Sequence, residues 1–201
     1  MLAQLLIGSS FAIASYQDVR KRAVSDIVWI PALVGAAYVV YSVFPNLFVE
    51  LIWLGLIGGI AFLFTYLGML GQADSIALVF FAADPYQLSP ILPVIAGAAV
   101  AVVHIGYEFA AGDARGTKTI PIEKFLKEQK WIPDAVIIDG VREKVDSDVN
   151  MARDEVEAKQ KAGTLVEVKY GVPTVAYLGI GYIACLIYLL VFGHAALLSL
   201  P

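Results

Sequence analysis

The chain has 201 residues, of which 59% are hydrophobic and 16% are charged, and its formal net charge is -4. Soluble globular domains contain about 45–50% apolar and about 25% charged residues. The composition therefore favours a membrane protein over an ordinary soluble domain, and the acidic balance gives no reason to expect a nucleic-acid partner.

Six apolar stretches follow one another along the chain. A helix needs about 20 mostly apolar residues to cross a bilayer, and backbone polar groups in lipid must be satisfied within the segment, so we expect each stretch to be a transmembrane helix. The fourth stretch is short and needs neighbouring protein to cover its ends. In chain order the expected helices are about Leu2–Tyr16, Ile27–Phe44, Leu47–Leu67, Ser75–Ala83, Pro90–Ala111 and Val172–Leu198.

The basic residues fall into two segments. Arg20, Lys21 and Arg22 follow the first apolar stretch, and the other eleven of the 14 Lys and Arg lie between Arg115 and Lys169. Cytoplasmic loops of membrane proteins are enriched in Lys and Arg. We therefore interpret the first three as membrane anchors. Six spans place both basic segments on the cytoplasmic side and both termini outside.

The segment 112–171 carries the signals of a small mixed domain. Pro and Asp residues that commonly begin helices, and a Gly that commonly ends one, predict short helices. Alternating apolar and polar residues predict strands. The overall prediction is an all-α polytopic membrane protein: six transmembrane helices, with a small cytoplasmic α/β insertion before the last. The expected divisions are 1–111 (helices 1–5), 112–171 and 172–201. Within the insertion we expect a helix from Pro121, a strand Asp134–Asp139, a helix from Asp146 or Ser147 to Gly163, and a strand Thr164–Tyr170.

Two aspartates lie at the expected cytoplasmic ends of helices. Asp18 ends the first helix and Asp74 begins the fourth. A charge at membrane depth costs a few kcal/mol and suggests a functional site. If the two helices are neighbours, the carboxyls share one proton and form an aspartic-protease pair. Gly68 and Gly71 would let an extended peptide approach the backbone.

Simpler interpretations remain open for each acid. Asp18 precedes Arg20 and is explained equally by an interfacial charge pair. Asp74 is explained by an N-cap, as is Asp26 at the start of the second helix. Two other functions also fit the pattern: a small proton- or cation-coupled transporter, and a non-catalytic membrane component of a filament-assembly machine.

Cysteine and histidine are too few for a cysteine-type zinc site. Cys185 stands alone in the last apolar stretch, and the two histidines are His104 and His194. A two-carboxylate mechanism requires neither a metal nor a cofactor, so we expect none.

Three stretches resemble one known family. "GQAD" at Gly71–Asp74 resembles the GxGD signature of intramembrane aspartyl proteases, closest to the GxAD form of archaeal preflagellin and type IV prepilin peptidases. "SYQDVRKRAVSD" at Ser15–Asp26 resembles that family's first aspartate with its basic residues. "VKYGVPTVAYLGIGYIA" resembles the entry into its last helix. Ala73 stands where the strict motif has its second glycine.

The resemblance implies an aspartic endopeptidase with Asp18 and Asp74 as its catalytic pair. Gly68, Gly71 and Ala73 would support the motif backbone. Such an enzyme removes the short basic leader from pre-archaellins or archaeal prepilins at the cytoplasmic membrane face, and the apolar helix behind the cut remains on the mature subunit. The implied partners are that preprotein and the lipid bilayer.

Overall fold

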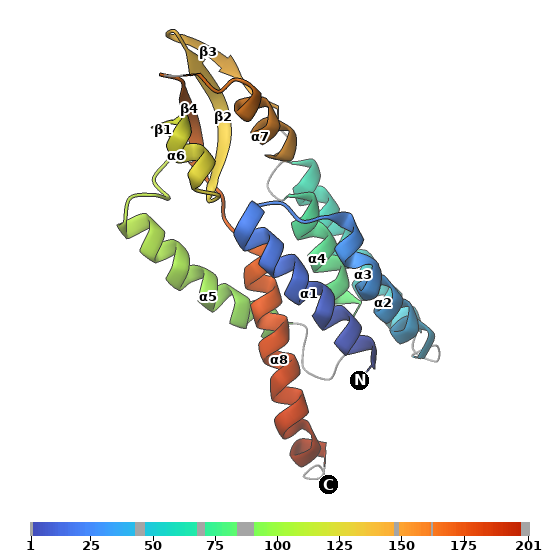
Figure 1. Ribbon diagram of the computed structural model, residues 1–201. Helices are drawn as coiled ribbons and strands as arrows, with labels where there is room; N and C mark the ends of the chain where they lie inside the picture. The colour runs from blue at the N-terminus through green and yellow to red at the C-terminus, as the bar shows by residue number, and fades with distance from the viewer. Residues whose placement is uncertain are drawn as a thin grey trace. The chain divides into compact units, whose positions relative to one another are not determined.

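The computed structural model describes residues 2–42, 47–67, 71–83, 91–146, 149–161 and 163–197. These residues form eight α-helices, one 3-10 helix and four strands (Figure 1). The chain divides into two compact units, here called the helical unit and the sheet unit. The helical unit comprises Met1–Tyr16, Val24–Ala101 and Thr174–Pro201; the sheet unit comprises Gln17–Ala23 and Val102–Pro173.

The helical unit is built from most of the apolar stretches. Helices α1 and α5 begin in it, and their last residues belong to the sheet unit. The elements are α1 (Leu2–Lys21), η1 (Asp26–Trp29), α2 (Ile30–Ser42), α3 (Leu47–Tyr66), α4 (Gln72–Ala82), α5 (Ile91–Ala110) and α8 (Thr174–Leu197).

The core of the helical unit gathers around Phe11 of α1, whose side chain is fully buried. Its ring centroid lies 5.6 Å from that of Trp29, 4.8 Å from Phe81 and 5.0 Å from Tyr182, with edge-on and stacked geometries that aromatic pairs favour. One residue earlier along α1, the Ser10 hydroxyl accepts a hydrogen bond of 3.0 Å from the backbone N–H of Ala32. Four elements, α1, η1, α4 and α8, therefore meet at one aromatic cluster.

The sheet unit contains one antiparallel sheet with strand order β1-β4-β2-β3. Side chains from the sheet, α6 and α7 form one core that includes Phe125, Trp131 and Val156. The Asp139–Gly140 turn joins β2 to β3 with positive φ at both residues (52° and 80°), as a type I′ hairpin requires. The elements are β1 (Lys118–Pro121), α6 (Ile122–Lys127), β2 (Trp131–Ile138), β3 (Val141–Lys144), α7 (Val149–Ala158) and β4 (Leu165–Tyr170).

The expected fold class, an all-α protein with six transmembrane helices, is wrong. The chain contains a four-stranded sheet. Among the described residues, only Thr174–Phe192 of α8 is long and apolar enough to cross a membrane. The other apolar helical stretches found there are shorter, and about 20 residues are needed. These stretches are Asp26–Ser42, Leu54–Tyr66, Gln72–Ala82 and Val94–Ala110.

The two helices and two strands expected between residues 112 and 171 are present, but some of their ends differ from the expected ones, and β2 begins at Trp131 rather than at Asp134. The helix from Pro121 is α6, with Pro121 as its N-cap residue. The expected strands correspond to β2 and β4, and the second helix is α7, which ends at Ala158 rather than at Gly163. Strands β1 and β3 were not predicted.

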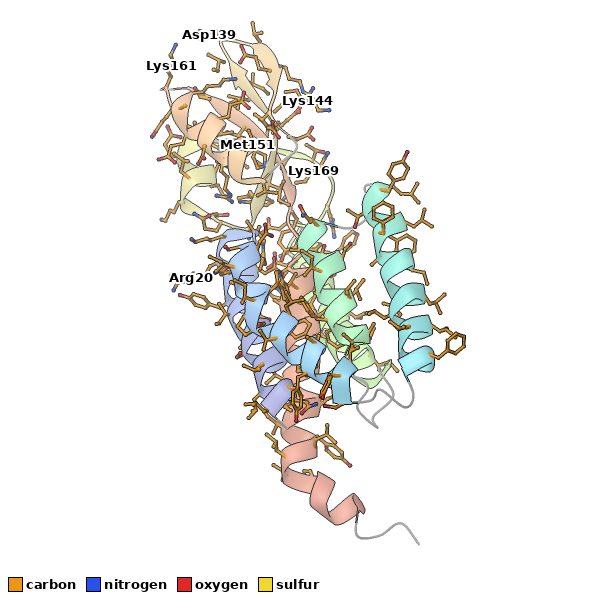
Figure 2. All side chains as sticks on the ribbon, turned by 90° about the vertical axis from the view of Figure 1, so that its right-hand side faces the viewer. Arg20, Asp139, Lys144, Met151, Lys161 and Lys169 are labelled. Carbon is orange, nitrogen blue, oxygen red and sulfur yellow. The ribbon has the colours of Figure 1, made fainter. Side chains whose placement is uncertain are left out.

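The two units expose different side chains. On the sheet unit, Figure 2 labels six side chains that are exposed, five of them charged: Arg20, Asp139, Lys144, Met151, Lys161 and Lys169. The helical unit exposes large apolar side chains along its helices. Examples from α2 and α3, each with at least 72% of its surface exposed, are Tyr41, Phe48, Phe62 and Tyr66.

Candidate active site

Asp18 lies in the last turn of α1, and its side chain is buried, with the residue 7% exposed. Its backbone carbonyl accepts hydrogen bonds from the backbone N–H of Arg22 (3.0 Å) and from Arg22 Nη1 (3.3 Å). A helix carries partial negative charge at its C-terminal end, and burial removes the water that would stabilise an ion. The helix end and burial therefore act against a negative charge on Asp18, whereas the basic residues Arg20, Lys21 and Arg22 that follow it act in favour of one.

Asp74 lies at the opposite kind of helix end. It is the third residue of α4, it is half-buried, and its Oδ2 accepts a hydrogen bond of 3.1 Å from the backbone N–H of Gly71, the N-cap residue. This is the carboxylate arm of a capping box. The helix N-terminus carries partial positive charge. The surroundings of Asp74 therefore favour the ionised carboxylate.

Gly71 makes room for this carboxylate. A Cβ at Gly71 would lie 3.2 Å from Asp74 Oδ2, closer than most such contacts. Its φ of -72° is open to other residues, so the requirement is for space and not for backbone freedom. A larger residue at position 71 would therefore crowd the Asp74 carboxylate, which would have to shift by a few tenths of an ångström.

The remaining predicted residues have less direct roles. Ala73 packs against the core of the helical unit, and Gly68 lies outside the described residues. The N-cap prediction for Asp26 is wrong, because Ser25 is the N-cap and Asp26 is the exposed first residue of η1. The N-cap of α4 is likewise Gly71, so Asp74 caps this helix from the third position.

The two candidate acids belong to different units. Asp18 is part of the sheet unit and Asp74 is part of the helical unit. The structure therefore describes the surroundings of each acid within its own unit.

A hydroxyl pair follows Asp74 directly. Ser75 Oγ and Thr65 Oγ1 are within hydrogen-bonding distance of each other. Each also lies within hydrogen-bonding distance of the carbonyl oxygen of Ala61, Ser75 at 3.2 Å and Thr65 at 3.0 Å, so the two hydroxyl protons are shared among three contacts. This cluster lines a mainly apolar groove of about 560 Å³ between α3 and α4. The sequence analysis missed it, although two hydroxyl residues in apolar helices were a readable signal.

A charge network ties the end of α5 to the sheet unit. Asp113 binds the ammonium groups of Lys118 (2.7 Å) and Lys130. Hydrogen bonds from both lysines lower the pKa of Asp113 to about 2. Glu108 lies 3.8 Å from Lys130 and 3.5 Å from His104. These acids are therefore neutralised by neighbouring bases, which indicates a structural role.

No family model, curated protein or solved structure matches the chain. Among the residues that the structure describes, no group of three or more His, Cys, Asp or Glu side chains is arranged to hold a metal ion. The candidate site therefore depends on the two aspartates and their surroundings.

Proposed function

We propose that the chain is a membrane aspartic endopeptidase in which Asp18 and Asp74 share one proton. The observation that carries the proposal is the contrast between the two helix ends. Asp74 accepts the Gly71 N–H at a helix N-terminus, where negative charge is favoured, and Asp18 is buried in the last turn of α1, where it is disfavoured. Two carboxyls whose surroundings separate their protonation states are suited to act as base and acid.

The reaction assigns one role to each acid. Ionised Asp74 takes a proton from water, and the resulting hydroxide attacks the scissile carbonyl carbon while protonated Asp18 donates to the carbonyl oxygen. In the second step Asp74 donates its proton to the leaving amide nitrogen, the C–N bond breaks, and Asp18 regains the proton. The cycle consumes one water and requires no metal or cofactor.

The proposed substrate is a preprotein with a short basic leader and an apolar helix, of the pre-archaellin or archaeal prepilin type. The resemblance of Gly71–Asp74 to the GxGD signature supports this class. The exposed apolar side chains of the helical unit support a location at the membrane, where such a substrate is inserted. Helix α8 is the segment suited to anchor the protein there, with cleavage at the cytoplasmic face.

The test is cleavage of an archaellin precursor by the purified protein in detergent, followed by mass spectrometry. Asp74→Asn retains an amide oxygen that can accept the Gly71 N–H, so it preserves the cap and removes only the ionisable group. We expect both Asp18→Asn and Asp74→Asn to abolish leader removal. The double variant should be little worse than either single one, because residues that act as a unit are not additive.

Asp26→Asn is the matched control. Asp26 is an exposed carboxylate in the helical unit, outside the proposed pair. We expect this variant to remain active. A folded Asp18→Asn protein that cleaves at the wild-type rate would remove Asp18 from the mechanism. An inactive wild-type protein would instead leave Asp74 with its capping role alone.

A further inference from the structure

Two arginines of the sheet unit lack a counter-charge. Arg22 follows α1, and Arg153 lies in α7. In the described part of the chain, neither guanidinium forms a salt bridge with a carboxylate. The Nε atom of each is buried and has no hydrogen-bond partner among the described residues. Both arginines are half-buried, and charges removed from water are normally paired, so both groups require an explanation.

Both arginines contact the same end of the β2–β4 ladder. Arg153 Nη2 donates to the carbonyls of Gln129 (2.9 Å) and Trp131 (2.8 Å). The Arg22 guanidinium lies 5.8 Å from the ring centroid of Tyr170, the residue paired with Trp131 across the ladder. The two positive groups thus lie at one end of the two central strands of the sheet.

Arg22 is fixed by an unusual backbone conformation. Its φ of 54° lies in the left-handed region, which arginine rarely adopts. The backbone N–H and Nη1 both donate to the carbonyl of Asp18. Non-glycine residues held in this region are concentrated at ligand-binding and active sites. Arg22 therefore ends α1 in an αL motif, and its side chain follows at a fixed point of the chain.

Three acids near Lys130 are already engaged. Glu108 and Asp113 face Lys130, and Glu128 accepts the indole N–H of Trp131 at 2.8 Å. Burial, and then the positive charge of Arg22, lower the pKa of Arg153. Arg153 also stacks 4.9 Å over Phe125, but a ring face offsets only part of a desolvated charge. Glu108, Asp113 and Glu128 therefore do not offset the charges of Arg22 and Arg153.

We propose that Arg22 and Arg153 bind a phosphate-type oxyanion at this end of the β2–β4 ladder. Arginine presents a planar set of N–H donors that matches the oxygens of phosphate, and such charge-assisted hydrogen bonds are strong. A bound oxyanion would supply negative charge to both guanidinium groups. The ligand is either a free phosphate or the phosphate of a lipid headgroup. This site goes beyond the proposed peptidase activity.

Calorimetric titration with inorganic phosphate, at constant ionic strength set by chloride, tests the proposal. We expect saturable binding by the full-length protein in detergent, and a loss of affinity of about ten-fold or more in Arg153→Gln and in Arg22→Gln. Arg142→Gln is the control, because its guanidinium already binds Asp134 and Glu167. Its affinity should equal that of wild type.

The wild-type protein provides a readout that is independent of the variants. Phosphate should raise its thermal unfolding temperature above that in chloride, since a ligand of the folded state stabilises it. Arg22→Gln removes a single side-chain hydrogen bond within the described part of the chain, so we expect it to fold. It serves as the second variant if Arg153→Gln fails to fold. Absence of phosphate binding, or binding that neither variant weakens, would overturn the proposal.

Repeating the titration in micelles that contain phosphatidylglycerol distinguishes the two sources. If the site takes a lipid headgroup, the lipid occupies it and the heat of phosphate binding disappears. If the site takes free phosphate, the heat is unchanged.

Discussion

The helical unit and the sheet unit differ most at their surfaces. The helical unit exposes large apolar side chains such as Phe62 and Tyr66, whereas the sheet unit exposes charged ones such as Lys144 and Lys169 (Figure 2). Both units nevertheless have buried cores, one around Phe11 and one around Trp131. In the sheet unit, most buried side chains are apolar and many exposed ones are charged. In the helical unit, large apolar side chains are found both in the core and at the surface, so the two sets differ in position rather than in chemistry.

This difference bears on the surroundings of each unit. Large contiguous apolar surfaces mark sites of membrane or protein contact. The sheet unit carries ion pairs such as Lys159 with Glu143 and Glu155, which are typical of a surface in water. The helical unit, in our proposal, contacts lipid. Substitutions at buried and at exposed positions of each unit test this difference.

The largest effect is expected in the aromatic core of the helical unit. Phe11→Ala removes a fully buried ring that contacts Trp29, Phe81 and Tyr182. We expect it to lower the free energy of unfolding by roughly 3–5 kcal/mol, as for other buried phenylalanines. The measurement is denaturant unfolding in detergent.

Phe62→Ala is the control for this substitution. Phe62 is 72% exposed, so truncation leaves no internal cavity. We expect little change in stability. An equal loss for the two variants would mean that Phe62 is as tightly packed as Phe11, and the distinction between an inner and an outer apolar surface would fail.

A smaller effect is expected where α5 meets α8. A Cβ at Gly97 would lie 2.5 Å from the carbonyl oxygen of Tyr177, and backbone cannot yield as a side chain does. We expect Gly97→Ala to destabilise the protein by about 1–3 kcal/mol through overpacking.

Gly55→Ala is the same substitution in an open position. No heavy atom lies within 4 Å of a Cβ at Gly55 in α3. Alanine is the better helix former, so we expect a gain of roughly 0.5–1 kcal/mol. Thermal unfolding of both variants should show shifts of opposite sign. A shift of the same sign would contradict the packing of α5 against α8.

The sequence predicted the sheet unit better than the helical unit, for a physical reason. Apolar and polar residues alternate at Thr164–Tyr170 because one face of the strand is in water, and this alternation identifies β4. The helix stop signal at Gly163 helps to identify α7. Strand β3 was missed because its four residues are all exposed, although the Asp139–Gly140 dipeptide was a usable hairpin signal. Strand β1 is four residues long and is defined by its distant pairing with β4.

The helical unit lacks such a contrast. Where apolar residues cover all sides of a helix, the pattern is the same for a membrane span and for a core helix, and the count of six spans was wrong for this reason. At the candidate site, Asp18 and Asp74 were found by their place in short motifs. Arg22 was interpreted as a membrane anchor, and Arg153 was not singled out, because their shared position depends on the folded sheet.

The smallest effect is expected from the charge network of the sheet unit, and it should depend on pH. Hydrogen bonds from Lys118 and Lys130 lower the pKa of Asp113 from 3.8 to about 2. Because the folded protein favours the ionised form, this stabilisation is fully present above pH 4 and is lost as the pH falls through about 2. Asp113→Asn should therefore be less stable than wild type at neutral pH, and the difference should close between pH 4 and pH 2.

Asp139→Asn is the matched control for this pH dependence. Asp139 is exposed at the β2–β3 turn, and asparagine tolerates its positive φ as well as aspartate does. No ion pair involves it within the described part of the chain. Its unfolding curve, followed by urea titration at each pH, should track that of wild type. A difference for Asp113→Asn that stays constant down to pH 2 would show that the lysines hold the loop by hydrogen-bond geometry and not by charge. The sheet unit would then lose the electrostatic character that separates it from the helical unit.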